Sequence, residues 1–472
     1  MRWLAAHTWL LALVPLTVVL VVCYYTGFPV SLLSDSEVPY LDRDTVLCVR
    51  LMNEGQERAK TIRYTAQTQD GSRFLLYLQK DSLDYPRAGD VLLVQTTVHR
   101  GGILGDFDYG RYLRLQGLAG SGWAHRGNWQ VIGNQPLRGP RAIAERCQHA
   151  LHERYRALGI HGQELGIVSA LTLGYREELD KKVQQSFSAA GAMHILAVSG
   201  LHTGVMWGVI MWLLTLGGLA KPLYEQRGRR WAIAMVGIVA LWGYAFVTGL
   251  SPSVMRSALM VTLLEISYLL RRTLSSINCL SAAAVIILLI NPLSLWSVSF
   301  QLSFAAMAGL LFVARRMQQR VMLRGALFSY IGGLLLTSVA AQIGTAPLTL
   351  YYFGQTSNYF ALTNIAVIPM AFVLFALCLG ALALSWCIVG TWIGTAVQGC
   401  AWLLRKYVEW IESLPYSTTQ IEISAPSVFL LYGAIICGLL MMRGERVHWW
   451  WLIGVSTCLT TAVMIETRGL YG

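Results

Sequence analysis

Apolar and polar positions are unevenly distributed along the 472 residues of this chain. Residues 31–160 carry 17 Lys+Arg and 14 Asp+Glu, whereas residues 161–472 carry only 19 and 11 over more than twice the length. The second region divides into apolar runs close to the ~20 residues that an α-helix needs to cross a bilayer. The pattern predicts a polytopic α-helical membrane protein with a small soluble module inserted near its N-terminus.

The soluble module, residues 38–133, alternates between apolar and polar side chains in short segments bounded by Gly, Asp, Asn and Pro. This period-2 pattern is typical of strands and turns. The expected strands are Thr45–Met52, Ala59–Thr68, Arg73–Gln79, Asp90–His99 and Leu118–Ala124. Five short strands of this kind predict a small β-barrel.

The remaining segments predict helices of two kinds. Residues 1–30 contain an apolar run, Trp9–Phe28, without a small-residue cleavage site, so we expect a transmembrane anchor there and not a signal peptide. Residues 139–190 predict amphipathic, interfacial helices, and residues 191–466 a transmembrane domain. Its candidate spans are 194–218, 231–249, 254–270, 276–290, 295–314, 326–346, 361–386, 388–404, 427–442 and 449–465. With the anchor, about 11 transmembrane helices are expected.

Basic clusters between the spans give an orientation. They are Arg227/Arg229/Arg230, Arg271/Arg272, Arg315/Arg316/Arg320/Arg324 and Arg443/Arg446. All four fall on one side of the predicted spans, which the positive-inside rule identifies as the cytoplasm. The N-terminus is then cytoplasmic and the β-barrel extracytoplasmic. Arg405 and Lys406 fall on the opposite side and are interpreted as capping an amphipathic helix at the membrane interface.

Polar residues gather at four places inside the predicted spans, where an unpartnered polar group costs several kcal/mol. The candidate channel-lining residues are His194, Ser199, Gly200, His202, Arg256, Gln301, Ser303, Gln342, Thr345 and Asn364. Small residues and amides of this kind also serve helix packing and hydrogen bonding between helices. Arg256 differs, because an intramembrane Arg needs a phosphate, a carboxylate or water. Only five acidic residues occur between residues 190 and 430, which favours the path of a polyanion over that of a cation.

Neither metal nor cofactor chemistry is predicted. The nine cysteines include no CxxC pair, and two histidines without a carboxylate or thiolate make an incomplete metal site. Cys48 and Cys147 lie in the polar region and could form a disulfide in an oxidising compartment. The sequence also lacks a GxxxxGK[ST] phosphate-binding loop, so the protein is not expected to power transport itself.

The motifs around these polar residues resemble the ComEC family of competence DNA-uptake channels. The most specific of them is the segment from His194 to His202, HILAVSGLH. The other motifs occur in the same order along the chain as in the family. They are FDYGRYL from Phe107, LTLG from Leu171, TGLSPSVMR from Thr248, Asn291-Pro292, SFQLSF from Ser299 and QIGTAP from Gln342. The resemblance implies an OB-like domain outside the membrane and a transmembrane competence domain that passes one DNA strand inward.

This sequence differs from many members of the family in one respect, and the resemblance also implies partner proteins. Many relatives carry a C-terminal metallo-β-lactamase-like nuclease domain with an HxHxDH motif, which this sequence lacks. A separate nuclease and a DNA receptor are therefore expected outside, with an ATP-driven motor and single-strand-binding proteins in the cytoplasm. The implied localisation is a bacterial inner membrane, in contact with lipid, and a homo-oligomer is an option.

The soluble module has the composition of a surface that binds single-stranded DNA, because basic and aromatic side chains are interleaved along it. The candidates are Arg58, Lys60, Arg63, Arg73, Tyr77, Arg111 and Tyr112. The alternative interpretation is a barrel with core aromatics and solvated charges.

The sequence therefore predicts a channel for single-stranded DNA uptake during natural transformation, and not an enzyme. Two other functions stay open. A small-solute secondary transporter would normally need intramembrane carboxylates, which are scarce here. A membrane-embedded hydrolase or metalloenzyme could use His194, Ser199 and His202, yet no Asp or Glu lies nearby to orient them.

Overall fold

The computed structural model describes residues 41–57, 60–80, 85–104, 107–125, 127–136, 139–215, 227–270, 276–314, 317, 325–441, 454–458 and 460–461. The predicted anchor over residues 1–30 lies outside this part of the chain, as do the basic clusters that begin at Arg271, Arg315 and Arg443. By its internal contacts the chain divides into two compact units, one containing the strands β1 to β9 and the other most of the helices.

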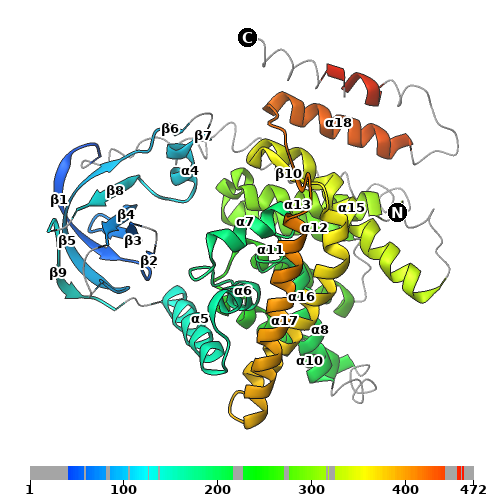
Figure 1. The fold of residues 1–472 in the computed structure, drawn as a ribbon, viewed down its shortest axis with the longest axis horizontal. Coiled ribbons are helices and arrows are strands. Elements are labelled where there is room, and N and C mark those ends of the chain that lie inside the picture. Colours follow the sequence, from blue (N-terminus) through cyan, green and yellow to red (C-terminus); the bar gives the residue numbers. More distant parts are fainter. Residues whose placement is uncertain are drawn as a thin grey trace. The chain divides into compact units, whose positions relative to one another are not determined.

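The strands form a closed barrel, as the alternating pattern predicts (Figure 1). Its five strands are β1 (Asp44–Leu51), β3 (Thr61–Thr68), β4 (Arg73–Gln79), β5 (Asp90–His99) and β8 (Ser121–Ala124). They pair in the order β1-β3-β4-β8-β5, and β5 pairs again with β1, which closes the barrel. Among these pairs β4 and β8 run parallel and the others antiparallel. This is a small OB-like barrel.

Four short strands and one helix complete this unit. The strands are β2 (Gln56–Glu57), β6 (Ile103–Leu104), β7 (Phe107–Asp108) and β9 (Trp129–Asn134), and the helix α4 (Tyr109–Leu115) precedes β8. Alternate residues of each barrel strand point inward, so that in β3 Ile62, Tyr64 and Ala66 are buried. The Tyr64 hydroxyl reaches the rim and donates a hydrogen bond to the backbone oxygen of Pro86 at 2.9 Å, which satisfies the one polar atom of this buried ring.

The other unit is helical. Its elements are most of α5 (Pro140–Ala157), α6 (Gly162–Leu173), α7 (Lys181–Ala189), α8 (Gly200–Leu214), α10 (Arg227–Val247), α11 (Pro252–Leu269), most of α12 (Ser276–Ile290), α13 (Val298–Gly309), the π-helical turn η3 (Leu310–Ala314), α15 (Ala326–Phe353), α16 (Phe360–Ala383), α17 (Ile388–Glu412) and α18 (Ala425–Met441). The short helix η2 (Pro292–Trp296) is grouped with the barrel unit. A two-stranded ribbon, β10 (Gln355–Ser357) and β11 (Thr418–Gln420), joins the segments that follow α15 and α17.

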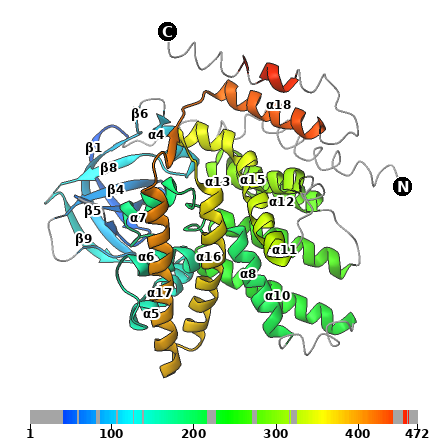
Figure 2. The same cartoon turned by 45° about the vertical axis from the view of Figure 1, so that its right-hand side comes forward.

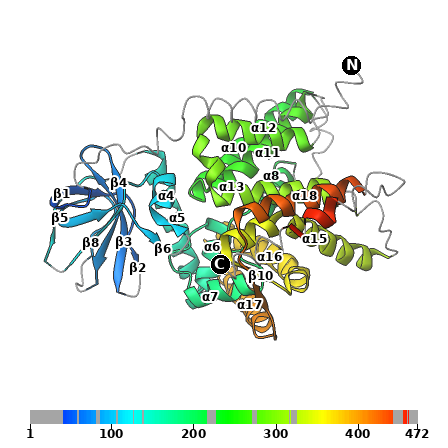
Figure 3. The ribbon, with the colours of Figure 1, turned by 90° about the horizontal axis from the view of Figure 1, so that it is seen from above.

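Two groups of neighbouring helices define the packing of this unit. Figure 2 shows α16 and α17 side by side as an antiparallel pair. Figure 3 shows α8, α10 and α11 together, and each of these three helices contacts the other two. Helices α13 and α15 cross at Gly309 and Gly344, where an added Cβ would lie 2.3 Å from the carbonyl oxygens of Ala340 and Ala305, respectively. Such a crossing requires glycine on both helices.

Three helices of the described residues are long and apolar enough to cross a membrane. They are Arg229–Val247 in α10, Phe328–Phe353 in α15 and the whole of α16. Shorter apolar stretches occur at His202–Leu214, Ser276–Ile290, Val298–Ala314 and Ala425–Leu440. These observations agree with a membrane protein, and the full set of about 11 spans stays a prediction.

One expectation differs from the structure. The span expected from residue 194 begins only at Gly200 as α8, and His194 lies in the turns before it. The helix starts at Gly200 because Ser199 has an extended backbone and acts as the N-cap residue, and Gly191, with a positive φ of 76°, lies in the turn that follows α7. Cys48 belongs to β1 in one unit and Cys147 is exposed on α5 in the other, and a disulfide between them stays a prediction.

Candidate functional site

The SGLH segment forms the N-terminal cap of α8. The backbone N–H of Ser199 donates to Nδ1 of His202 at 3.1 Å, and the Ser199 hydroxyl lies 3.0 Å from the same nitrogen. This is a capping box in which histidine takes the place of the usual Glu or Gln. The His202 ring is buried, lies 5.4 Å from the ring of Phe375 on α16, and leaves its Nε2 without a hydrogen-bond partner. His202 therefore fixes the start of α8 and keeps one free nitrogen.

The start of α8 packs closely against α11. An added Cβ at Gly200 would lie 3.0 Å from the Ser257 hydroxyl, so a side chain there would press on α11. The residue before Ser257 is Arg256, which is only 3% exposed. Its Nη2 donates to the backbone oxygen of Ser299 on α13 at 2.9 Å and lies 3.5 Å from the Ser299 hydroxyl. Arg256 thereby connects α11 with the third polar cluster.

Further hydrogen bonds extend this connection. The Tyr352 hydroxyl of α15 donates to Gln301 of α13 at 2.7 Å, and Gln342 of α15 donates to the Thr356 hydroxyl of β10 at 3.2 Å. The next residue, Ser357, lies against Gly191, where an added Cβ would be 2.9 Å from the Ser357 Cβ.

Gly191 stands three residues before His194, so the contacts return to the segment from which they started. All four polar clusters of the sequence are therefore linked, by way of α8, α11, α13, α15 and β10. We call this set of contacts the polar circuit.

Several buried side-chain atoms in or next to these elements and in α16 have no hydrogen-bond partner. These atoms are His202 Nε2, Ser251 Oγ, Arg256 Nε, Ser338 Oγ, Ser357 Oγ and Asn364 Oδ1. In an apolar surrounding, each such group costs about 1–3 kcal/mol or more if nothing solvates it. The interior of this unit thus presents unused donors and acceptors to water or a ligand.

The predicted lining residues differ in their exposure and in whether their polar atoms have hydrogen-bond partners. Gln301 and Gln342 are engaged across helices, and Thr345 donates to the Ala341 backbone oxygen at 3.0 Å within α15. Ser303 is half-buried one turn after Ser299 on α13, and His194 is exposed. His202, Arg256 and Asn364 keep an unpartnered atom, and they are the members whose geometry best suits a ligand.

The sequence did not single out four of the connecting residues. Ser299, Tyr352, Thr356 and Ser257 all hold a predicted residue in place. Ser299 could have been found from its position two residues before Gln301 in the SFQLSF segment. Tyr352 lies in an apolar run, Thr356 lies in the polar segment from Gln355 to Asn358, and Ser257 directly follows Arg256. None of the three carries a signal of its own.

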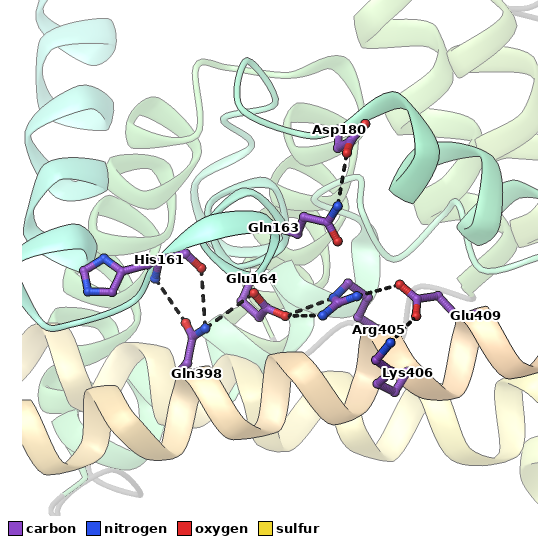
Figure 4. Close-up of polar contacts among 8 residues, drawn as sticks. All are labelled: His161, Gln163, Glu164, Asp180, Gln398, Arg405, Lys406 and Glu409. Carbon is purple, nitrogen blue, oxygen red and sulfur yellow. Dashed lines mark hydrogen bonds and ion pairs between the residues drawn. The ribbon is translucent and has the colours of Figure 1, made fainter.

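A second polar network joins α6 to α17 (Figure 4). The Arg405 guanidinium contacts Glu164 on α6 at 2.8 Å and Glu409 on its own helix at 2.6 Å, and Lys406 binds Glu409 at 2.9 Å. Gln398 accepts from the His161 backbone N–H at 3.1 Å. The two cations of α17 therefore both have carboxylate partners, the Arg405 pairs being largely buried and the Lys406 pair partly exposed.

The candidate DNA-binding residues of the barrel are spread over its surface. Arg63 and Tyr77 border a common hollow, whereas Lys60 and Arg73 are exposed. Arg58 and the side chains of Arg111 and Tyr112 lie outside the described part of the chain. Within the described residues, no group of three or more His, Cys, Asp or Glu side chains could hold a metal ion.

Comparisons with known proteins show which family this chain resembles in sequence. A family model described as "Competence protein" matches residues 171–446. The chain is 28% identical over 291 residues to ComE operon protein 3 of Bacillus subtilis, which covers 59% of this chain and 33% of that protein. It is 25% identical over 288 residues to competence protein ComA of Neisseria gonorrhoeae, covering 61% and 39%, respectively.

Recombination protein 2 of Haemophilus influenzae is 28% identical over 147 residues, covering 31% of this chain and 18% of that protein. The alignments to the first two relatives thus span between a third and two fifths of the relatives' lengths. No solved structure matches the chain significantly.

Proposed function

Because this chain belongs to the competence protein family, we propose that its helical unit conducts single-stranded DNA across a bacterial inner membrane during natural transformation. The observation that carries the proposal is the position of Arg256. Its guanidinium is always charged, it is buried, and among the described residues it hydrogen-bonds to the neutral Ser299. Among the described residues, no carboxylate forms an ion pair with it.

A buried charge without a counter-charge is unfavourable by several kcal/mol. The deficit is removed if water or an anion reaches the guanidinium, and a phosphate matches its fork of donors especially well. The other unpartnered atoms of this unit include those of His202, Ser338, Ser357 and Asn364, and none of these side chains is permanently charged. One cation among neutral polar groups suits a conduit, since a ligand must bind well enough to enter and weakly enough to leave.

The rest of the proposal concerns organisation and partners. We infer about 11 spans, a cytoplasmic N-terminus, an extracytoplasmic barrel over residues 38–133, interfacial helices over 139–190 and a channel domain over 191–466. The family relationship supports a separate nuclease and receptor outside and an ATP-driven motor inside, with the protein itself acting as a passage and not as an enzyme.

The experiment follows labelled double-stranded DNA in a transformable host that carries this gene. In a deletion strain, DNA should still bind and be cut at the surface, but no labelled single strand should accumulate inside. The strain is complemented with the wild-type gene as control, and protein abundance is measured in the membrane fraction. Normal accumulation of internal strand without the protein would refute the proposal.

A further inference from the structure

The LTLG segment ends helix α6 at a place where two other turns of the chain meet it. Gly174 caps this helix with a left-handed backbone, φ 70°. A Cβ added there would lie 3.2 Å from the backbone oxygen of Thr248 and 3.5 Å from Cγ2 of Val198, so both φ and the close approach favour glycine. Thr248 lies in the turn before α11, and Val198 lies in the turn before α8. Three of the sequence motifs therefore meet at Gly174.

The side chain of Gln148 on α5 lies between these turns. It is partly buried, and its Nε2 donates to the backbone oxygen of Leu173 at 2.6 Å. This oxygen belongs to the last turn of α6, where the helix itself supplies no donor. A Cβ added at either Gly174 or Gly249 would lie 3.9 Å from the same Nε2. Gln148 thus binds the end of α6 and also lies against the turn before α11.

The end of α6 is held from a second direction. The Tyr244 hydroxyl of α10 donates to the backbone oxygen of Thr172 at 3.3 Å. The N–H of Thr248 in turn donates to the backbone oxygen of Tyr244 at 3.0 Å. Side chains of α5 and α10 therefore bind two successive carbonyls of α6, and the turn before α11 begins next to this anchor.

The turn before α11 has an unfavourable backbone conformation. Gly249 and Leu250 both have a positive φ, 73° and 52°, respectively. A left-handed backbone is unfavourable for leucine because its Cβ crowds the following carbonyl oxygen, so surrounding contacts must hold it. The Leu250 N–H donates to the Ala245 backbone oxygen at 2.9 Å, and its side chain packs against the cluster that contains Val198 and Val254. The turn therefore depends on the neighbours that fix it.

We propose that Gln148 is a positioning residue for DNA transport, because it holds the turn from which α11 carries Arg256 toward α13. The inference rests on the proposed function and concerns how the cation of the conduit is aimed. Arg256 follows Leu250 by six residues and donates to the Ser299 backbone oxygen at 2.9 Å. A displacement of about 1 Å at the entry to α11 would stretch this bond beyond hydrogen-bonding distance.

The test measures internal strand accumulation in the deletion strain complemented with variants, divided by the abundance of each variant in the membrane fraction. Gln148→Met keeps the length of the side chain but removes its donors, so accumulation should fall about tenfold. Gln148→Lys retains a donor for the Leu173 oxygen and should recover most of it. The matched control is Gln163→Met on α6, which removes an exposed bond of 3.1 Å to Asp180 and should have no effect.

A double-mutant cycle separates positioning from packing. In an Arg256→Lys background the fork of donors that Ser299 holds is already lost, so Gln148→Met should lower accumulation further by about twofold or less. A defect of packing alone would lower it by the same factor in both backgrounds. If Gln148→Met does not reach the membrane, Gln148→Glu replaces it, since a carboxylate of the same shape cannot donate.

Equal factors in the two backgrounds, or unchanged accumulation in the Gln148 variants that lack a donor, would overturn the inference. Normal accumulation of internal strand in the uncomplemented deletion strain would overturn the proposed function instead. The two failures are therefore distinguishable.

Discussion

The guanidinium of Arg256 donates to the backbone oxygen of Ser299 at 2.9 Å, from the second turn of α11 to the first turn of α13. This single bond joins two segments that are polar within otherwise apolar helices. A backbone oxygen accepts a hydrogen bond but does not neutralise a charge. The pair therefore positions the guanidinium and leaves its charge available to an anion.

Replacing Arg256 should reduce DNA uptake by an amount that depends on the charge and the hydrogen-bonding geometry of the new side chain. Arg256→Gln removes the charge and is expected to lower internal strand accumulation at least a hundredfold, whereas Arg256→Lys keeps a point charge without the fork and should be intermediate. The matched control is Arg230→Gln on α10, whose guanidinium stacks on Tyr268 at 3.6 Å and donates to its backbone oxygen. If Arg256→Gln lowers membrane abundance instead of uptake, Arg256 serves packing.

The unpartnered atoms predict water access to the interior. In a cysteine-free background, Ser338→Cys on α15 should react with a small cationic methanethiosulfonate, because a hydrated path supplies both water and reagent. A protein that retains only the fully buried Cys378 should not react. The reaction rates are followed by mass spectrometry, with and without single-stranded oligonucleotide, which should slow the modification. Equal inertness of the two thiols would argue for a dry interior.

The crossing of α13 and α15 depends on glycine. Gly309→Ala or Gly344→Ala would place a methyl group 2.3 Å from a carbonyl oxygen, so the helices must separate, at a cost of about 1–3 kcal/mol. The midpoint of thermal unfolding in detergent should fall for both variants. Gly333→Ala is the control, since nothing lies within 4 Å of its added Cβ on the same helix. Unchanged midpoints in the first two variants would contradict the close crossing.

The pair between Glu164 and Arg405 should stabilise the contact of α6 with α17. Their side chains are 9% and 15% exposed, so Glu164→Gln leaves a buried cation less compensated and should cost about 3 kcal/mol. The double variant with Arg405→Gln should cost less than the sum of the single ones, and a double-mutant cycle on the unfolding free energy measures this. Glu153→Gln breaks a pair that is 45% exposed on each side and should change stability by less than about 1 kcal/mol.

Asp70 gives the barrel a defined response to acid. Its partial burial opposes ionisation, but hydrogen bonds from the Thr68 and Ser72 hydroxyls and the Ser72 backbone N–H hold the pKa of the carboxyl below its ordinary value of 3.8. Since the folded pKa is the lower one, Asp70 stabilises the fold above pH 3.8 and loses this effect as the pH falls further. The stability difference between wild type and Asp70→Asn should shrink in that range, and a constant difference would contradict the assignment.

The sequence by itself determined the class of the protein. Period-2 alternation identified all five barrel strands, because inward and outward residues of a strand are set by local geometry. Long apolar runs identified the helices, because burial in lipid demands them. The polar segments at His194–His202, Arg256, Gln301 and Gln342 were visible because such residues are rare in apolar spans.

The tertiary structure decided which of these residues meet. No periodicity links Arg405 to Glu164, which is 241 positions away, or Tyr77 to Trp123 across a parallel strand pair. The helix start at Gly200 depends on a hydrogen bond from Ser199 to His202 that the sequence pattern, read as one continuous span, did not reveal. Partners of this kind depend on how elements pack against one another, and packing is a property of the whole fold and not of any local segment.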